Sequence, residues 1–287
     1  MFDYVIVGYC YDYKDENNIL IHKYGPHLFH TNNKEVFDYL SRFSEWEVYH
    51  HEVLAMIYGS KVPIPFNINT LYKLFPNSLA IKLEEKLLKE YTLNSQVSIL
   101  ELKKSNDKDL QFLADFVYEK IFVHYTEKQW GMKPEEIDSV VTARVPIFVG
   151  KGNRYFNDID QVVPKNGYTK LFENLINHSN IKLMLNTDFK EVCKFNENDV
   201  CVFGTKFEGK VIYTGQIDEL FDYKFGELLY RSLEMKFESI DLEYYQEAVT
   251  VNYHNSDDFT RITEFKLIHP SLSFDLFNGG SLCKIMN

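Results

Sequence analysis

The interpretation of this chain starts from residues 122–131, which read Phe122-Val123-His124-Tyr125-Thr126-Glu127-Lys128-Gln129-Trp130-Gly131. Apolar residues recur at helical spacing over 110–121, just before this stretch, and predict a helix that leads into it. Tryptophan is scarce, with two in the chain, yet Trp130 follows Tyr125 by five residues among polar neighbours. An aromatic side chain with a polar tip can stack on a flat ligand ring and also donate a hydrogen bond. Two interpretations stay open: Tyr125 and Trp130 line a binding cleft, or they cap the helix and pack into a core.

The composition is that of an ordinary globular protein, with 287 residues of which 45% are hydrophobic and 25% are charged. The formal net charge of −11 argues against nucleic acid or an anionic membrane as the main partner, so an anionic ligand would need local cations. The four cysteines show no Cys-x-x-Cys spacing, and we expect reduced thiols and no metal site. No apolar run approaches the roughly 20 residues that span a bilayer, and no signal peptide is visible. We therefore expect a cytoplasmic protein without membrane insertion.

Several short motifs, in order along the chain, together resemble those of the UDP-galactopyranose mutases. These flavoenzymes interconvert the pyranose and furanose forms of UDP-galactose. The motifs are HKYGPHLFHT at 22–31, PFNINT at 65–70, YTEKQWG at 125–131, GYTKL at 167–171, YTG at 213–215, FDY at 221–223, YRSL at 230–233 and TRI at 260–262.

The resemblance implies an α/β fold with an FAD-binding Rossmann-like domain, incomplete here, an inserted helical domain and an antiparallel or mixed β-sheet domain that binds substrate. The expected boundaries are 1–45 and 160–233 for the FAD-binding domain, 70–137 for the helical domain, 46–69, 138–159 and 234–270 for the β-sheet domain, and 271–287 for an atypical tail. Residue patterns predict helices over 33–42, 78–91 and 168–176, a hairpin over 53–62, and strands over 4–7, 19–21, 181–185 and 211–213.

The first predicted strand lacks the loop that should follow it. In a dinucleotide-binding fold a G-x-G-x-x-G loop opens a helix whose N-terminus holds the pyrophosphate. After Gly8 the next glycine is Gly25, and the crossover helix and second strand are missing, a shortfall of about 30 residues. The family's C-terminal glycine–arginine segment for the flavin also has no counterpart after Gly279 and Gly280. We therefore predict weak or absent FAD binding.

The resemblance assigns the nucleotide-sugar site residue by residue. Arg144 and Arg261 correspond to two arginines that bind the diphosphate, and guanidinium groups suit this role because they make bidentate charge-assisted hydrogen bonds. A surface ion pair is the alternative for each arginine. The other expected substrate contacts are Phe122 and Tyr125 beside the uracil ring, Thr126 and Trp130 in the same cleft, Tyr155 at a phosphate, and Asn67.

The resemblance also assigns the flavin site and the catalytic groups. The expected cofactor contacts are Gly8, His27, His30, Gly167, Tyr168, Thr169, Thr214 and Gly215. The expected catalytic residues are Arg144, Arg261, His27 and His30. Lone histidines are more often structural, and that alternative remains for both.

The function implied is that of a UDP-galactopyranose mutase acting on UDP-galactose through an adduct between reduced flavin N5 and the sugar, for a galactofuranose-containing surface polysaccharide. The protein supplies orientation and charge stabilisation in such a reaction. A homodimer is compatible with this family. Two alternatives remain: an inactive nucleotide-sugar-binding remnant, and a flavin-dependent amine oxidase-like oxidoreductase, which does not account for the Trp130 motif.

Overall fold

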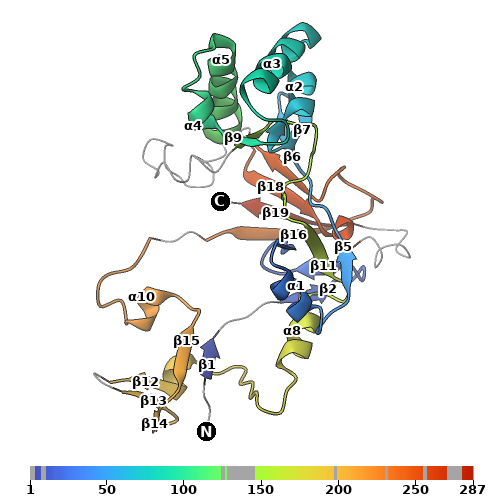
Figure 1. The fold of residues 1–287 in the computed structure, drawn as a ribbon. Helices are drawn as coiled ribbons and strands as arrows, with labels where there is room; N and C mark the ends of the chain where they lie inside the picture. Colours follow the sequence, from blue (N-terminus) through green and yellow to red (C-terminus); the bar gives the residue numbers. More distant parts are fainter. Residues whose placement is uncertain are drawn as a thin grey trace. The chain divides into compact units, whose positions relative to one another are not determined.

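A computed structural model describes residues 4–7, 11–123, 127, 146–196, 199–229, 232–254, 257–269 and 280–286. The chain forms two compact units. The smaller unit combines Met1–Tyr11 with Tyr168–Tyr230, and the larger unit combines Asp12–Gly167 with Arg231–Asn287. Figure 1 draws the elements of both units along the chain, and each unit is described by itself.

The smaller unit is built on two parallel strands, β1 and β15, paired from Tyr4 with Lys210 to Val7 with Tyr213. A separate antiparallel meander has the strand order β12-β13-β14. The bounds in this unit are β1 (Tyr4–Val7), α8 (Tyr168–Ile176), α9 (Phe189–Val192), β12 (Cys193–Phe195), β13 (Val200–Val202), β14 (Thr205–Phe207), β15 (Lys210–Tyr213) and α10 (Ile217–Leu220). The helix predicted over 168–176 and the strand predicted over 211–213 are confirmed by α8 and β15.

The strand predicted over 181–185 is wrong. This segment has no regular structure, and its apolar side chains are exposed, with Leu183 at 59% and Leu185 at 71%. A strand needs a neighbour that satisfies its backbone N–H and C=O groups, and no described strand of this unit pairs with 181–185. The apolar pattern of the segment is therefore strand-like, but none of the described strands pairs with it.

The larger unit contains a six-stranded mixed sheet in the order β16-β19-β18-β17-β6-β7. Its hairpin β6–β7 turns through Tyr58 and Gly59, whose φ values of 50° and 77° match the two-residue turns that favour glycine. This confirms the predicted hairpin over 53–62. The bounds of the six strands are β6 (Val53–Ile57), β7 (Ser60–Ile64), β16 (Glu234–Ile240), β17 (Thr250–Tyr253), β18 (Phe259–Glu264) and β19 (Gly280–Met286).

Three smaller sheets complete this unit, with the orders β8-β10-β9, β4-β11-β5 and β2-β3. Their bounds are β2 (Asp12–Lys14), β3 (Leu20–His22), β4 (Phe29–Thr31), β5 (Trp46–Val48), β8 (Phe66–Asn67), β9 (Gln96–Ser98), β10 (Pro146–Phe148) and β11 (Asp160–Pro164). The 3-10 turn η3 (Phe265–Leu267) follows β18, and α1 (Lys34–Leu40) confirms the helix predicted over 33–42.

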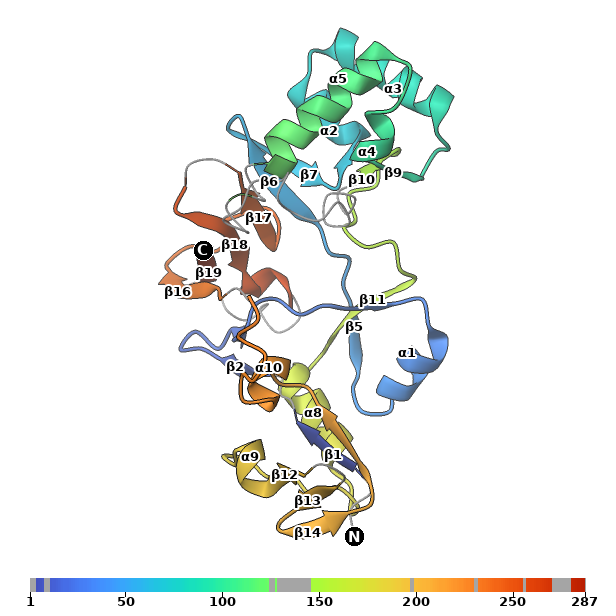
Figure 2. The same cartoon turned by 90° about the vertical axis from the view of Figure 1, so that its left-hand side faces the viewer.

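A helical region lies beside the β6–β7 hairpin, as Figures 1 and 2 show. It comprises α2 (Ile68–Leu74), α3 (Asn77–Glu90), α4 (Ile99–Leu102), α5 (Lys108–Val117) and the π-helical turn η1 (Tyr118–Val123). Helix α3 buries Ala80, Leu83 and Leu87, three and four residues apart, because this spacing places them on one helical face. The helices predicted over 78–91 and 110–121 are thereby confirmed.

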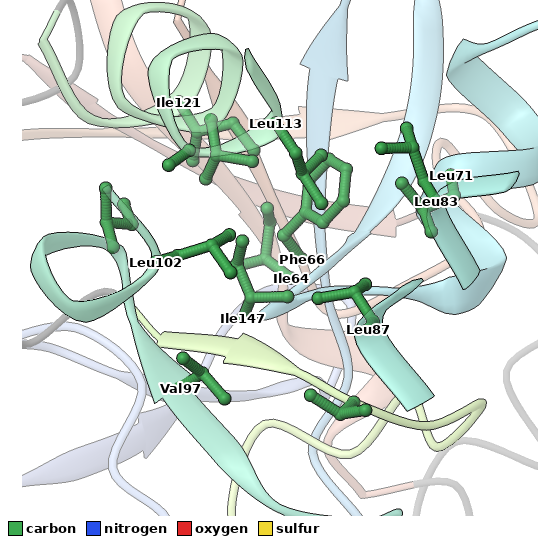
Figure 3. Close-up of a cluster of buried hydrophobic side chains, with 14 of the residues drawn as sticks. Ile64, Phe66, Leu71, Leu83, Leu87, Val97, Leu102, Leu113, Ile121 and Ile147 are labelled. Carbon is green, nitrogen blue, oxygen red and sulfur yellow. The ribbon is translucent and has the colours of Figure 1, made fainter. Parts of the chain in front are cut away.

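The main core of the larger unit joins these helices to the hairpin. Figure 3 shows its side chains converging from α3, α5, β8 and β10, with Leu83, Leu113, Phe66 and Ile147 among those labelled. Leu83, Leu113 and Ile147 are completely buried. A second cluster, formed by Ile19, Ile21, Val163, Val249, Phe265, Ile268, Cys283 and Ile285, underlies the sheet near β3 and η3. None of the described helices is long and apolar enough to cross a membrane.

Candidate functional site

Four polar side chains form a row on one face of the six-stranded sheet. Strands β17 and β18 pair antiparallel, with Thr250 opposite Thr263 and Asn252 opposite Arg261. Because side chains alternate along a strand and opposed residues share a face, these four lie together on one side, and we call them the polar row. On the same face, the neighbouring strand β6 places the buried apolar side chain of Val53 next to Thr250.

The polar row contains buried atoms that lack hydrogen-bond partners. Among the described residues none bonds to Thr250 Oγ1, Asn252 Oδ1, Arg261 Nε or Thr263 Oγ1, although all four atoms are buried. A buried polar atom without a partner costs about 1–3 kcal/mol. Four such atoms in one patch are therefore suited to a polar ligand or to bound water.

An aromatic and imidazole cluster surrounds His51, whose pKa is lowered in part by the charge of Arg261. His51 is 6% exposed, and its ring centroid lies 5.7 Å from that of Tyr155 and 5.9 Å from that of Phe156. His30 stacks on Phe156 at 3.7 Å. Burial, followed by the charges of Arg261 and then His30, lowers the pKa of His51 to about 4. We call His30, His51, Tyr155 and Phe156 the ring cluster.

Hydrogen bonds hold His30 in this cluster. Its Nδ1 lies 2.7 Å from Asp158 Oδ2, and Asn32 donates from Nδ2 to the other oxygen of the same carboxylate at 2.8 Å. The Asp158 carboxylate therefore joins β4 to the segment between Gly150 and β11. His30 thus has a fixed position beside Phe156.

Asn67 lies elsewhere in the larger unit and its side chain is fully used by the fold. Its Oδ1 accepts from Thr70 N at 3.0 Å, which caps α2, and its Nδ2 donates to Gly152 O at 2.9 Å and to Asn153 Oδ1 at 3.1 Å. The structure therefore gives Asn67 a clear architectural role. Its contact with substrate stays a prediction.

Other predicted substrate residues can be placed only in part. Phe122 lies in η1, is 3% exposed and stacks on Tyr118 with 5.4 Å between ring centroids. Tyr155 is 42% exposed at the edge of the ring cluster. The remaining predicted residues outside the described part of the chain are Gly8, Tyr125, Thr126, Trp130 and Arg144. The expected meeting of Arg144 with Arg261 therefore stays a prediction.

The predicted flavin contacts fall in both units. In the larger unit, His27 Nδ1 lies 2.7 Å from Gly25 O, and His27 N donates to His22 Nδ1 at 3.0 Å. In the smaller unit, Tyr168 and Thr169 begin α8, while Thr214 and Gly215 are exposed after β15. Gly167 has a φ of +85°, and a Cβ added there would lie 2.7 Å from Asp12 Oδ2. A protein carboxylate thus already fills the space beside that glycine.

The described residues do not form the pyrophosphate cradle that FAD requires. Strand β1 ends at Val7 and β2 begins at Asp12, so only residues 8–11 connect them. A crossover between parallel strands needs about a dozen residues or more. In addition, β2 pairs antiparallel with β3 rather than joining the β1–β15 sheet.

Sequence reasoning missed Asn252, Thr250, Thr263 and His51 as members of the site. The alternating pattern of Thr250-Val251-Asn252 and Arg261-Ile262-Thr263 was a visible signal, since both triplets place polar groups on one face of a strand. Only the register of β17 against β18 shows that the two polar faces coincide.

The fold and the site together define a class of protein. A parallel strand pair, an inserted helical region and a mixed sheet are features of α/β folds of the flavoprotein type. A solved structure of reduced UDP-galactopyranose mutase has the same fold, with a TM-score of 0.60 over 96% of this chain and 65% of that chain, at 14% identity.

Sequence comparisons identify the family. A family model described as UDP-galactopyranose mutase matches residues 120–276. The dTDP-fucopyranose mutase of Escherichia coli is 34% identical over 92% of this chain and 69% of its own length. The UDP-galactopyranose mutase of Mycoplasma pneumoniae is 33% identical over 90% of this chain and 65% of its own length. The chain belongs to the UDP-galactopyranose mutase family and spans about two thirds of the length of these relatives.

Family and fold class are thus confirmed as the sequence predicted them. The comparisons support the mutase function and do not favour the amine oxidase-like alternative.

Proposed function

We propose that this protein is a mutase that interconverts the pyranose and furanose forms of a nucleotide sugar, with UDP-galactose as substrate. The observation that carries the proposal is the polar row, where the buried atoms Arg261 Nε and Asn252 Oδ1 have no described partner. This patch occurs in a chain of the mutase family and on the strand that carries one of its expected diphosphate arginines.

Arg261 would bind the diphosphate of the nucleotide. Its planar guanidinium can donate two parallel hydrogen bonds to phosphate oxygens, and partial burial strengthens this attraction relative to water. A local cation is needed because the chain as a whole carries a formal charge of −11. By holding the diphosphate in place, Arg261 would keep the leaving group close enough to return to the sugar.

The other expected residues would complete the site around the same ligand. Trp130 and Tyr125 would stack on or flank the uracil ring, and Arg144 would be the second diphosphate cation. His27 and His30 remain the proposed catalytic neighbours of the sugar. Because the described residues lack the FAD cradle, these roles concern only the nucleotide sugar.

The identity of the sugar has two candidates. The E. coli relative is named a dTDP-fucopyranose mutase, whereas the Mycoplasma pneumoniae relative is named a UDP-galactopyranose mutase. Both names describe a nucleoside diphosphate with a hexose, so Arg261 suits either ligand. UDP-galactose is preferred because the matched family model bears that name.

The proposed function is tested by following the conversion of UDP-galactofuranose to UDP-galactopyranose chromatographically. Dithionite and a large excess of FAD are supplied, because the chain is expected to bind FAD weakly. dTDP-fucofuranose is run in parallel. Conversion by the wild type and a loss of about 100-fold or more in Arg261→Ala are expected. Conversion of neither sugar, together with no UDP binding in calorimetry, would refute the proposal.

A second candidate is a nucleotide-sugar-binding protein without isomerase activity. It is favoured by one observation, the connection of only residues 8–11 between β1 and β2. It predicts UDP binding, seen as a change in tryptophan fluorescence, with no flavin absorbance bands in the purified protein. Stoichiometric flavin bands would exclude it.

Location, assembly and biological role complete the proposal. We place the protein in the cytoplasm as a homodimer that does not bind nucleic acid, in line with its negative charge. Its product would enter a galactofuranose-containing surface polysaccharide. Size-exclusion chromatography with light scattering tests the dimer.

A further inference from the structure

The six-stranded sheet of the larger unit ends in two edge strands, β7 and β16, which differ in how their outward backbone groups are covered. Along β7, helix α2 supplies the partners. Thr70 Oγ1 donates to Pro63 O at 3.0 Å, and Lys73 Nζ donates to Lys61 O at 3.1 Å. Proline also has no N–H group to offer to a further strand. The β7 edge is therefore closed by the protein's own residues.

The β16 edge is open. This strand pairs with β19 along all seven residues, and no described strand pairs with its other side (Figure 2). Five of the seven residues are exposed, among them Phe237 at 39%, whose ring stacks on that of buried Phe265 with 6.3 Å between centroids. A long edge strand without proline presents unpaired N–H and C=O groups, and these can pair with another strand.

The charged side chains of β16 lie on the face of the sheet opposite to Phe237, because successive residues of a strand point to opposite faces. Glu238 accepts from Lys284 Nζ of β19 at 2.7 Å. Lys236 lies directly across from Lys284, so two positive charges face each other, and the Glu234 carboxylate is 3.6 Å from Lys236 Nζ. A further carboxylate beside Lys236 would therefore be favourable.

Pairing of this edge with the same edge of a second copy is restricted by the backbone. In an antiparallel pair, alternate residues direct both N–H and C=O to the same neighbour, so β16 offers only every second residue to a new partner. A two-fold axis must therefore pass through a residue and not between two residues. With the axis at Phe237 all seven residues are paired, and Lys236 of each copy lies opposite Glu238 of the other.

The two neighbouring registers that the backbone allows are unfavourable for charge. An axis at Lys236 places Lys236 opposite itself and Glu234 opposite Glu238. An axis at Glu238 places that carboxylate opposite itself. Like charges directly opposite each other destabilise a sheet, whereas opposite charges stabilise it. The charge pattern of β16 is thus self-complementary in the same register that gives the longest ladder.

We propose that two copies of this chain associate through the β16 edge, by antiparallel pairing around a two-fold axis at Phe237. The proposal rests on the homodimer of the proposed function, for which it names the interface. The two Phe237 side chains cover each other, and the two Lys236–Glu238 pairs determine the register. A single strand edge is a small interface, so we expect a reversible dimer with a Kd on the order of 10 μM that weakens with salt.

The first test is sedimentation equilibrium of the full chain over a concentration series that spans the expected Kd. Lys236→Glu and Glu238→Lys should each weaken self-association about tenfold or more, because each places like charges opposite each other twice in the ladder. Lys61→Glu is the matched control, since it reverses a lysine on the closed edge strand β7 and should leave the Kd within about twofold of the wild type.

Mixing the two single variants tests the register itself. In an equimolar mixture of the Lys236→Glu and Glu238→Lys chains, each chain supplies the charges that the other lacks, so dimers should form again with about the wild-type Kd. A substitution that merely disturbed folding would not be rescued in this way. A mixture that stays monomeric would overturn the proposal.

Amide hydrogen exchange locates the interface without a substitution. Peptides covering 234–240 of the wild type should exchange more slowly above the Kd than below it, because the outward N–H groups become paired. Peptides covering 60–64 should exchange at the same rate at both concentrations.

The outcomes separate this inference from the proposed function. If the wild type dimerises and both single variants dimerise equally well, the β16 interface is refuted while the homodimer stands. If exchange over 234–240 does not depend on concentration, the interface is likewise refuted. If the wild type stays monomeric throughout the series, the homodimer fails, the interface fails with it, and the β16 edge has a different occupant. The chromatographic conversion of the nucleotide sugar reports separately on the mutase activity.

Discussion

The two units of this chain differ in how completely they cover their apolar side chains. In the larger unit, Leu83 and Leu113 are completely buried between helices and the β6–β7 hairpin. In the smaller unit, Leu183, Leu185 and Leu229 are 59%, 71% and 103% exposed around a two-stranded parallel sheet. Parallel sheets are normally covered on both faces, and two strands alone are marginally stable. The larger unit thus has the packing to hold a rigid polar site, whereas the described residues of the smaller unit do not include the elements that would complete a flavin-binding fold.

The strongest test of this contrast is a matched pair of leucine truncations. Leu113→Ala should lower the free energy of unfolding by about 2–5 kcal/mol, because it opens a cavity in the main core. Leu183→Ala should change it by less than about 0.5 kcal/mol, because its side chain already contacts water. Urea unfolding followed by far-ultraviolet circular dichroism, which reports the secondary structure of both units, measures both. Equal losses in the two variants would break the contrast.

Acid should destabilise the larger unit through its buried histidines. Burial, then the charges of His269 and His27, lowers the pKa of His22 from 6.5 to about 3. The unfolded chain therefore binds the proton first, so the stability from this group is complete above pH 6.5 and is lost as the pH falls towards 3. The loss is on the order of 3–5 kcal/mol across that range. In the described part of the smaller unit the one histidine, His178, is exposed.

His22→Asn provides the check on this pH dependence. The asparagine can still accept from His27 N, as His22 Nδ1 does at 3.0 Å, but it does not titrate. Urea midpoints of the variant should fall less steeply than those of the wild type between pH 7 and pH 4.5. Parallel slopes in the two proteins would show that His22 is not responsible.

The smallest expected effect compares two tight turns. Gly59 between β6 and β7 and Gly204 between β13 and β14 have φ values of +77° and +74°, with no atom within 4 Å of an added Cβ. Alanine should therefore cost about 1 kcal/mol of backbone strain at either site. Both tryptophans, Trp46 and Trp130, belong to the larger unit. Fluorescence-detected unfolding should thus shift in Gly59→Ala and stay unchanged in Gly204→Ala, and a shift in both would show that the units unfold together.

Local patterns in the sequence predicted several elements correctly. Helix α8 over Tyr168–Ile176 and the β6–β7 hairpin follow from helical spacing and from the Tyr58-Gly59 turn, which depend on neighbours a few residues away. The order of the motifs also identified the family. The strand expected over 181–185 failed because a strand forms only when another segment supplies its hydrogen-bond partners.

By itself, the sequence determined the local elements, the family and the importance of Arg261, because each depends on residue identity and short-range spacing. The tertiary structure alone decided that Asn252 lies opposite Arg261, that the His51 ring packs near Phe156, and that residues 280–286 form β19 inside the main sheet. These facts depend on strand register and on contacts between distant segments. The strand register and these contacts are the ones that give the whole fold its lowest free energy, and no single stretch of residues encodes them.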